Sequence, residues 1–269
     1  MPNKPIFQGT RMRESSLRVQ GRVIHALFIR ELLTRYGRNN IGFLWLFVEP
    51  MLFTLAITTL WTATRTIHGS DLPIVEFAIT GYSSMMMWRN MPGRCIGAIK
   101  SNKSLLFHRQ VRPLDVYTAR LLLEFAGATV AFFLLVMAFW AADWAMLPED
   151  FMQVLGGWLM LGWFGFGLAV SLGVLAEKYE LVQKLWPPFS YFLFPFSGAA
   201  FIADSLPERA RDVLLHLPML NCTEYLREGY FGSKIHAHYD MVYVFIFNIL
   251  LTLIALSLTR TMPINRDYS

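Results

Sequence analysis

The chain is poor in charged side chains, which make up 16% of its 269 residues. Soluble domains usually carry about 25% charged residues. Hydrophobic residues reach 55%, more than a soluble fold of this length would normally bury. Because a lipid-facing surface has to be apolar, the composition excludes an ordinary soluble domain and predicts an integral membrane protein.

Motifs for nucleotide hydrolysis and nucleophilic catalysis are missing from the sequence. It contains no G-x-x-x-x-G-K-[ST] loop, which would bind ATP phosphates, and no G-x-S-x-G nucleophile elbow. All six histidines lie outside the most apolar segments, so no general base is offered at membrane depth. The sequence therefore predicts no catalytic residue and no bound cofactor.

Cysteines and metal-ligand clusters are also scarce. Cys95 and Cys222 fall on opposite sides of the predicted membrane topology, so neither a disulfide nor a shared metal site is expected. His236 and His238 are two residues apart and could share one face of a strand. Further ligands are missing, which favours an exposed loop and no metal site.

Six segments approach the length of about 20 apolar residues that a helix needs to cross a bilayer core. They are residues 41–64, 72–88, 116–142, 151–176, 185–203 and 241–259. The second is the weakest, and Pro187, Pro188 and Pro195 interrupt the fifth. We therefore predict an all-α integral membrane protein with a six-span domain over 41–259, an N-terminal segment at 1–40 and a tail at 260–269.

The distribution of Lys and Arg predicts the orientation of these spans. With the N-terminus in the cytoplasm, 19 of the 24 Lys and Arg residues fall on the cytoplasmic side. Basic residues concentrate in cytoplasmic loops of membrane proteins. Both termini are therefore predicted to be cytoplasmic. The inverted topology would require the opposite bias.

Two basic segments on the cytoplasmic side have features of their own. Residues 17–38 place apolar residues at helical spacing and arginines on another face, which predicts an amphipathic helix in the membrane interface. A plain membrane anchor is the alternative. Residues 94–113 are basic with a short apolar centre, which favours a helix that docks into a cytoplasmic partner. A solvated basic loop is the alternative there.

The segment 204–240 precedes the last span on the outer side. Its apolar stretch 213–223 is too short to cross a membrane, yet too apolar for a free loop. Non-helical backbone at membrane depth survives only where protein or a wet cavity satisfies it. The segment is therefore predicted to form outer re-entrant helices at the rim of a pathway. A compact outer cap is the alternative.

Charged pairs within single helices are suggested by four-residue spacing. Glu31 and Arg35 lie one helical turn apart, and so do Arg120 and Glu124. Glu49 lies inside the first span, where a charge is a functional candidate by default. A cap or ion pair near the cytoplasmic surface explains Glu49 equally well.

Two stretches resemble a known family. RYGRNNIGFLWLFVEPML at 35–52 and ADSLPERARDVLLHLPMLNCTEYLREGYFG at 203–232 resemble ABC-2-type export permeases. LREGYFG at 226–232 is similar to the capsular polysaccharide branch. Related O-antigen and teichoic acid permeases often carry Asn-Pro where this chain has Asn221-Cys222, which favours the capsule branch.

The resemblance implies a homodimer with a translocation path at the subunit interface, in a bacterial inner membrane. It also implies two copies of a cytoplasmic ATPase subunit, which would hold ATP and magnesium, and periplasmic and outer-membrane export proteins. No nucleic acid is expected as a partner. A coupling helix would dock into the ATPase, with the candidates Lys100, Lys103, Leu105, Leu106, Phe107, His108 and Arg109.

The function that follows is export of lipid-linked capsular polysaccharide by the permease subunit of an ATP-binding-cassette transporter. Arginine forks bind phosphate well, which gives the substrate-entrance candidates Arg30, Arg35, Arg38 and Arg89. Sugars stack on aromatic rings, although lipid-facing filler explains most aromatics. The pathway candidates are Trp45, Glu49, Phe53, Tyr82, Tyr191, Tyr225 and Tyr230.

Alternatives remain open from the sequence. The exported substrate could be O-antigen, teichoic acid or a small lipophilic drug. The protein could also be a membrane scaffold that gathers enzymes of polysaccharide synthesis without transporting anything.

Overall fold

The computed structural model describes residues 16–36, 48, 51–56, 59, 73–106 and 111–262, and every regular element in these ranges is helical. The longer helices are α1 (Ser16–Tyr36), α3 (Ile74–Cys95), α6 (Pro113–Ala141), α7 (Phe151–Lys178), α8 (Glu180–Leu193), α10 (Pro218–Phe231) and α11 (Met241–Arg260). The shorter elements are α4 (Ala98–Ser101), α5 (Lys103–Leu106), α9 (Glu208–Leu214) and the 3-10 turns η1 (Phe194–Phe196), η2 (Ala203–Ser205) and η3 (Gly232–Lys234). The all-α prediction is confirmed for this part of the chain.

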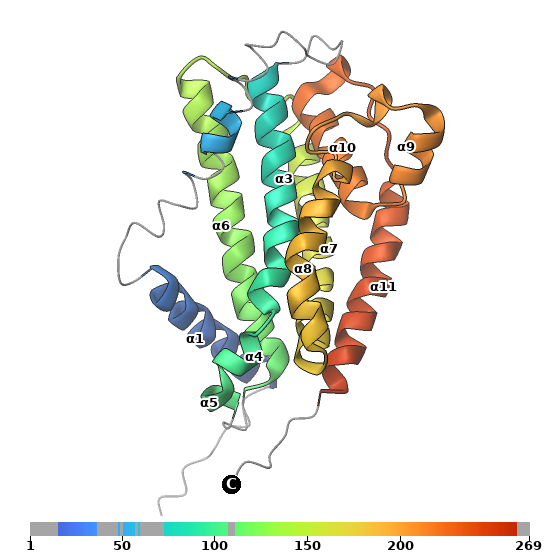
Figure 1. Cartoon of the computed structure of the whole chain (residues 1–269). Coiled ribbons are helices and arrows are strands. Elements are labelled where there is room, and N and C mark those ends of the chain that lie inside the picture. Colours follow the sequence, from blue (N-terminus) through green and yellow to red (C-terminus); the bar gives the residue numbers. More distant parts are fainter. Residues whose placement is uncertain are drawn as a thin grey trace, which may run out of the picture.

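Helix α7 is the central element of an elongated bundle (Figure 1). Helices α3 and α11 pack along it, and α10 packs against its first half. Helix α6 packs on α3, and α1 in turn packs on α6. Trp158 of α7 is buried in the core and donates a 2.8 Å hydrogen bond to Thr129 of α6, so the one polar atom of this large ring is satisfied.

Glycines on α7 allow its neighbours to approach closely. A methyl group at Gly157 would lie 3.0 Å from Cβ of Leu226 on α10, and one at Gly173 would lie 2.8 Å from Cβ of Cys95 on α3. Carbon atoms in contact normally stay about 3.5–4.0 Å apart. Both glycines therefore serve close helix packing within the chain.

Among the described residues, three helices, α6, α7 and α11, are long and apolar enough to cross a membrane. Their bounds agree with the predicted spans at 116–142, 151–176 and 241–259 to within three residues. Helix α3 covers residues 74–88 of the predicted second span at 72–88 and continues through Pro92 to Cys95. For the predicted first span, only 48, 51–56 and 59 are described, and these positions are helical.

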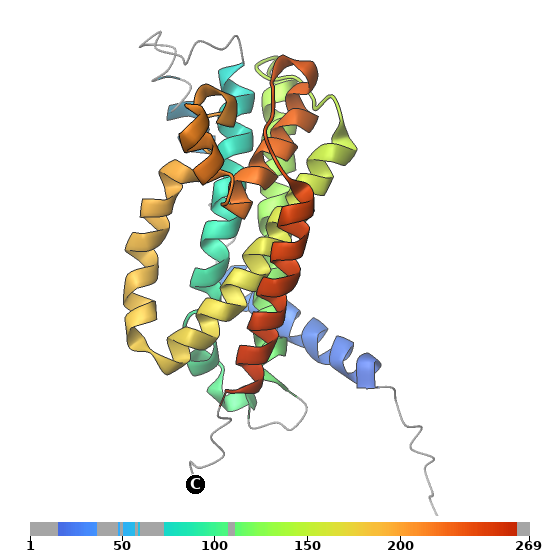
Figure 2. The same ribbon diagram turned by 90° about the vertical axis from the view of Figure 1, so that its right-hand side faces the viewer.

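Helix α8 is shorter than the predicted fifth span at 185–203. It begins at Glu180, passes through Pro187 and Pro188, and ends at Leu193. Fourteen helical residues rise roughly 21 Å, less than a bilayer core of about 30 Å. The helix ends because Pro195 opens a 3-10 turn and Gly198 adopts a left-handed φ of 77°, which turns the chain into the core. Figure 2 shows α8 at one edge of the bundle.

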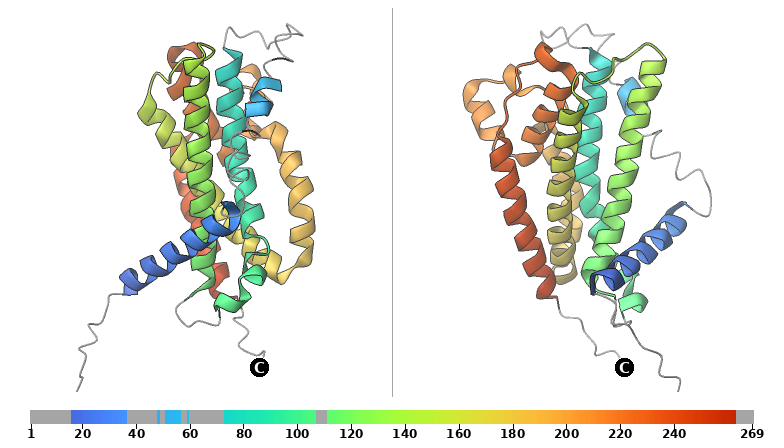
Figure 3. Two further views of the ribbon diagram at one scale, coloured as in Figure 1. Left: turned by 90° about the vertical axis from the view of Figure 1, so that its left-hand side faces the viewer. Right: turned by 180° about the vertical axis from the view of Figure 1, so that it is seen from behind.

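The two ends of the bundle carry different extra elements. At one end α1 crosses α6 obliquely, beside α4 and α5 (Figure 3). We name this the α1 end. At the opposite end lie α9 and α10, and we name this the α10 end (Figure 1). Most of α10 is buried, whereas α9 is largely exposed, so the predicted outer helices comprise one core helix and one surface helix.

Candidate functional site

At the α1 end, one buried carboxylate holds arginines from two other helices. Oε2 of Glu124 on α6 lies 2.6 Å from Nη1 of Arg35 on α1 and 2.9 Å from Nε of Arg94 on α3. The Glu124 side chain is 4% exposed. Hydrogen bonds between ionised partners are stronger than neutral ones. Glu124 therefore ties α1 and the end of α3 to α6.

A second ion pair crosses the same junction and corrects the predicted pairing. Nε of Arg120 on α6 lies 3.2 Å from Oε1 of Glu31 on α1. The sequence predicted Glu31 with Arg35 and Arg120 with Glu124, each within one helix. In the structure the partners are exchanged between helices, because α1 lies across α6 and the long side chains reach the neighbouring helix. The pairs hold two helices together instead of reinforcing each one.

The predicted coupling segment forms two short helices, α4 and α5, separated by Asn102. Lys100 and Lys103 are exposed, whereas Leu105 and Leu106 are partly buried. Phe107, His108 and Arg109 lie outside the described residues. The segment is therefore anchored at its apolar part and presents basic side chains outward, as a docking surface for an acidic partner requires.

Sequence reasoning missed the polar residues that fasten this segment. Oδ1 of Asn102 accepts a 2.8 Å hydrogen bond from Arg30 of α1, and Oγ of Ser101 accepts a 3.1 Å bond from Arg120 of α6. Nδ2 of Asn102 donates to the carbonyl of Ala98 at 2.9 Å. The available signal was an uncharged Asn inside a basic stretch, since Asn commonly ends helices.

The substrate-entrance candidates fall into two groups. Arg30 and Arg35 make the contacts at the α1 end given above. Arg89 of α3 is partly buried, and its guanidinium carbon lies 4.6 Å from the ring centre of Tyr191 on α8. Arg38 lies outside the described residues. The structure thus brings one entrance candidate, Arg89, against one pathway candidate, Tyr191.

The pathway candidates do not share one surface within the described chain. Tyr82 stacks on Phe53 with ring centres 3.7 Å apart, and Tyr191 is exposed on α8. At the α10 end, Tyr225 meets Tyr239 edge to face. Tyr230 is buried, and its hydroxyl donates to the carbonyl of Met146 at 2.8 Å. Trp45 and Glu49 lie outside the described residues.

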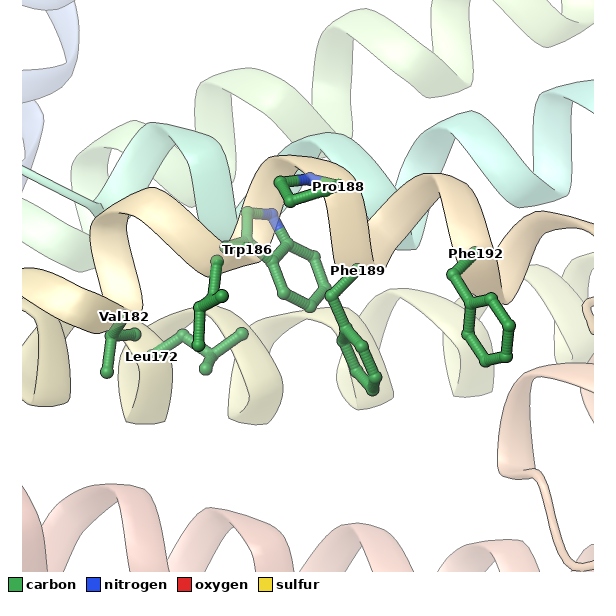
Figure 4. Close-up of a pocket in the computed structure, with 7 residues that line it drawn as sticks. Leu172, Val182, Trp186, Pro188, Phe189 and Phe192 are labelled. Carbon is green, nitrogen blue, oxygen red and sulfur yellow. The ribbon is translucent and has the colours of Figure 1, made fainter.

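An apolar groove of about 500 Å³ runs between α7 and α8. It is lined by Leu172, Val182, Leu185, Trp186, Pro188, Phe189 and Phe192 (Figure 4). Phe189 of this lining and Tyr191 of the same helix are more than half exposed. Helix α8 thus presents exposed apolar and aromatic side chains within the part of the chain that the structure describes.

At the α10 end, Arg227 is completely buried and is satisfied by backbone carbonyls. Its Nη1 donates to Phe201 O at 2.6 Å and its Nη2 donates to Ala199 O at 3.3 Å. Its guanidinium lies 3.9 Å above the ring centre of Phe77, and the buried Glu224 carboxylate lies 4.0 Å away. Arg227 therefore fixes the turn that follows α8 onto α10.

The rest of the LREGYFG motif also makes structural contacts. Glu228 accepts hydrogen bonds from Gln153 at 2.5 Å and from the Tyr239 hydroxyl at 2.6 Å. A methyl group at Gly229 would lie 2.8 Å from the backbone nitrogen of Val154. The motif therefore locks α10 to the start of α7. The sequence signal was the presence of charges within an otherwise apolar helix.

The remaining polar candidates at this end are structural. His238 lies 2.9 Å from Asp204, and this hydrogen bond holds the pKa of Asp204 below its ordinary value.

No group of three His, Cys, Asp or Glu residues that could hold a metal occurs among the described residues. Cys95, the last residue of α3, and Cys222 of α10 are free and buried. Asn221 begins the stretch Asn221-Cys222-Thr223, which matches a glycosylation sequon, but its side chain is fully buried.

Comparison with known proteins places the chain in a family. Residues 22–231 match the family model described as ABC-2 type transporter. The chain is 44% identical to the capsule polysaccharide export inner-membrane protein CtrC of Neisseria meningitidis serogroup B, over 90% of this chain and 92% of that protein.

Two further relatives agree with this result. The chain is 41% identical to the capsule polysaccharide export inner-membrane protein BexB of Haemophilus influenzae, over 92% of this chain and 93% of that protein. It is 28% identical to the polysialic acid transport protein KpsM of Escherichia coli, over 93% and 97% respectively. The chain belongs to the ABC-2 type transporter family, in the branch of the capsule polysaccharide export inner-membrane proteins.

Proposed function

We propose that this chain is the permease subunit of an ATP-binding-cassette exporter that moves lipid-linked capsular polysaccharide across the bacterial inner membrane. The 44% identity to CtrC carries the proposal, because that relative is named for capsule polysaccharide export at the inner membrane. The long apolar helices α6, α7 and α11 support a membrane location. A separate cytoplasmic subunit would bind ATP and magnesium and hydrolyse the nucleotide.

The proposed topology has six spans and both termini in the cytoplasm. Helices α3, α6, α7 and α11 would be the second, third, fourth and sixth spans, and residues 41–64 the first. The fifth would be α8 together with the turns that follow it up to residue 203. The basic residues of α1, α4 and α5 support placing the α1 end in the cytoplasm. At the outer end, α9 and α10 would be re-entrant, with α10 packed inside the bundle next to α7.

The exporter would be a homodimer with the translocation path between its subunits. The exposed aromatic side chains of α8 support this arrangement, because they are available to contact a second subunit and a polymer as well as lipid. Aromatic rings with few charges suit a sugar polymer that has to slide without being trapped. In a diderm bacterium, periplasmic and outer-membrane export proteins would carry the polymer onward.

Arg89 is the entrance candidate that the geometry favours. Its contact with Tyr191 holds a guanidinium between α3 and α8, beside the proposed path. A planar guanidinium can bind phosphate through two parallel hydrogen bonds, which a lysine cannot reproduce. Arg89 would therefore receive the phospholipid end of the substrate.

Gene deletion with complementation tests the function. Loss of surface polysaccharide with accumulation inside the cell is the expected result, because synthesis would continue without export. Normal surface polysaccharide would contradict the proposal, and new drug sensitivity would then indicate drug export. Absence of polymer from every cell fraction would instead indicate a scaffold for synthesis.

Complementing variants test the entrance assignment. Arg89→Ala and Arg89→Lys should both reduce export, since neither keeps the fork. Lys184→Ala is the matched control, because it removes one exposed cation from neighbouring α8. Full export by Arg89→Lys would contradict the need for a fork.

A further inference from the structure

The α4–α5 segment is fastened to two other helices by side-chain hydrogen bonds. Arg30 of α1 donates to Asn102 at 2.8 Å, across 72 positions of sequence. Arg120 of α6 donates to Ser101 at 3.1 Å and to the carbonyl of Arg94, the residue before the end of α3, also at 3.1 Å. Movement of the segment would therefore act directly on α1 and α6.

Asn102 serves two contacts with the two ends of its amide. Its Nδ2 donates to Ala98 O, which closes the turn of α4, and its Oδ1 accepts from Arg30. The side chain is only 4% exposed, so it has little freedom to turn away. The residue that ends α4 is thus the one that binds α1. Helix α4 therefore cannot shift relative to α1 unless the bond between Asn102 and Arg30 breaks.

Helix α1 in turn connects to α6 and, through Glu124, to the end of α3. Five residues after Arg30, Arg35 binds Glu124 of α6 at 2.6 Å, and Glu124 also binds Arg94 at the end of α3. Glu31, between these two arginines, pairs with Arg120. A chain of charge-assisted contacts of this kind is a physical route by which displacement at one site biases another.

We propose that α1 is a working part of energy transmission, with Arg30 and Asn102 as the positioning residues that make it move with the α4–α5 segment. This inference rests on the proposed function, in which an ATPase subunit docks on that segment. It distinguishes α1 from a plain membrane anchor, which would need only its apolar side chains. Each displacement of α4 would then reach α6 directly through Arg120 and again through α1.

A double-substitution cycle in the complete transporter tests the proposal. Arg30→Ala, Asn102→Ala and the double variant are each purified with the ATPase subunit and compared for ATP hydrolysis and polymer export. Each single substitution should lower the polymer exported per ATP hydrolysed by about five-fold, a common strength of coupling between sites. The double variant should lose no more than the single ones, because both remove the same bond.

Two further variants separate this role from others. Asn102→Asp keeps the oxygen that accepts from Arg30 but loses the amide that donates to Ala98. It should retain export per ATP, which shows that the contact with α1 matters more than the local turn. Arg18→Ala removes an arginine from the exposed face of α1 and should leave export unchanged.

The outcomes are distinguishable. Normal export per ATP in Arg30→Ala, with the ATPase still bound, would overturn this inference alone. Multiplying losses in the double variant would also overturn it, because Arg30 would then act separately, for example in binding substrate. Failure of any ATPase to co-purify with the unsubstituted chain would overturn the proposed function together with the inference.

Discussion

The two ends of the bundle use arginine in opposite ways. At the α1 end, Arg35 and Arg94 share the carboxylate of Glu124, and Arg94 keeps 44% of its side-chain surface exposed. At the α10 end, Arg227 is wholly buried and bonds mainly to backbone carbonyls. An arginine near solvent, such as Arg94, can exchange its carboxylate partner for water at little cost, whereas a fully buried cation cannot be hydrated.

This difference indicates which end can change shape. An ion pair between helices is satisfied in more than one arrangement of those helices. The Arg227 contacts instead require the turn after α8, α3 and α10 to keep one position. We therefore expect the helices at the α1 end to move relative to one another during transport, and the α10 end to stay one unit around Arg227.

The largest effect is expected for Arg227→Ala. The substitution leaves Glu224 buried without its cation and removes the donor to Phe201 O and Ala199 O. Breaking a buried pair in this way costs about 3–5 kcal/mol of folding free energy. Thermal unfolding of the purified protein in detergent should show a large decrease in midpoint, together with low yield in the membrane.

Two controls bracket the Arg227 result. Arg209→Ala removes an exposed arginine from α9 and should leave the midpoint nearly unchanged. Arg227→Lys keeps the charge but not the fork, and should fall between the two. An unchanged midpoint for Arg227→Ala would mean that the α10 end is not fixed by this residue.

The next effect is expected for Gly157→Ala, where α7 meets α10. The added methyl group would lie 3.0 Å from Cβ and 3.1 Å from Cα of Leu226, so one helix has to shift. Overpacking of this kind costs about 1–3 kcal/mol. Gly93→Ala on α3 meets open space and gains helix propensity, so it should not destabilise. Equal midpoints for the two variants would argue against a rigid α7–α10 contact.

Helix positions were the most predictable feature of this chain. Uncharged runs located α7 and α11, and the acids before them, Asp150 and Asp240, accept hydrogen bonds from Gln153 N and Tyr243 N as N-caps. The end of α8 was less predictable. Its prolines at 187 and 188 lie within the helix, and the stop comes only at Pro195 and Gly198.

Contacts between helices were the least predictable feature. Four-residue spacing correctly identified Glu31, Arg35, Arg120 and Glu124 as residues that pair, but it assigned each the wrong partner. Local spacing carries no information about which helix lies alongside. Arg227 falls in the predicted outer segment 204–240, and its burial depends on carbonyls contributed by a turn 26 to 28 residues away. The entrance and pathway assignments stay predictions.

A smaller effect is expected for Glu124→Gln at the α1 end. The substitution removes the charge that Arg35 and Arg94 share but keeps an amide oxygen as acceptor. Because Arg94 is partly exposed and can be hydrated instead, the loss should be about 1–2 kcal/mol. Hydrogen exchange of α1 amides should rise while that of α10 amides stays constant. Equal changes at both ends would contradict the separation of the two ends.

The smallest effect is expected for the exposed pair of Asp204 and His238, which tests whether burial or location makes the α10 end rigid. The hydrogen bond from His238 lowers the pKa of Asp204 in the folded protein. Its stabilisation is therefore present above the ordinary carboxyl pKa and is lost as pH falls through the lowered folded value. Asp204→Asn should lower the unfolding midpoint slightly at neutral pH, and the difference should shrink in acid. A decrease as large as that of Arg227→Ala would mean that location at this end, and not burial, makes a contact rigid.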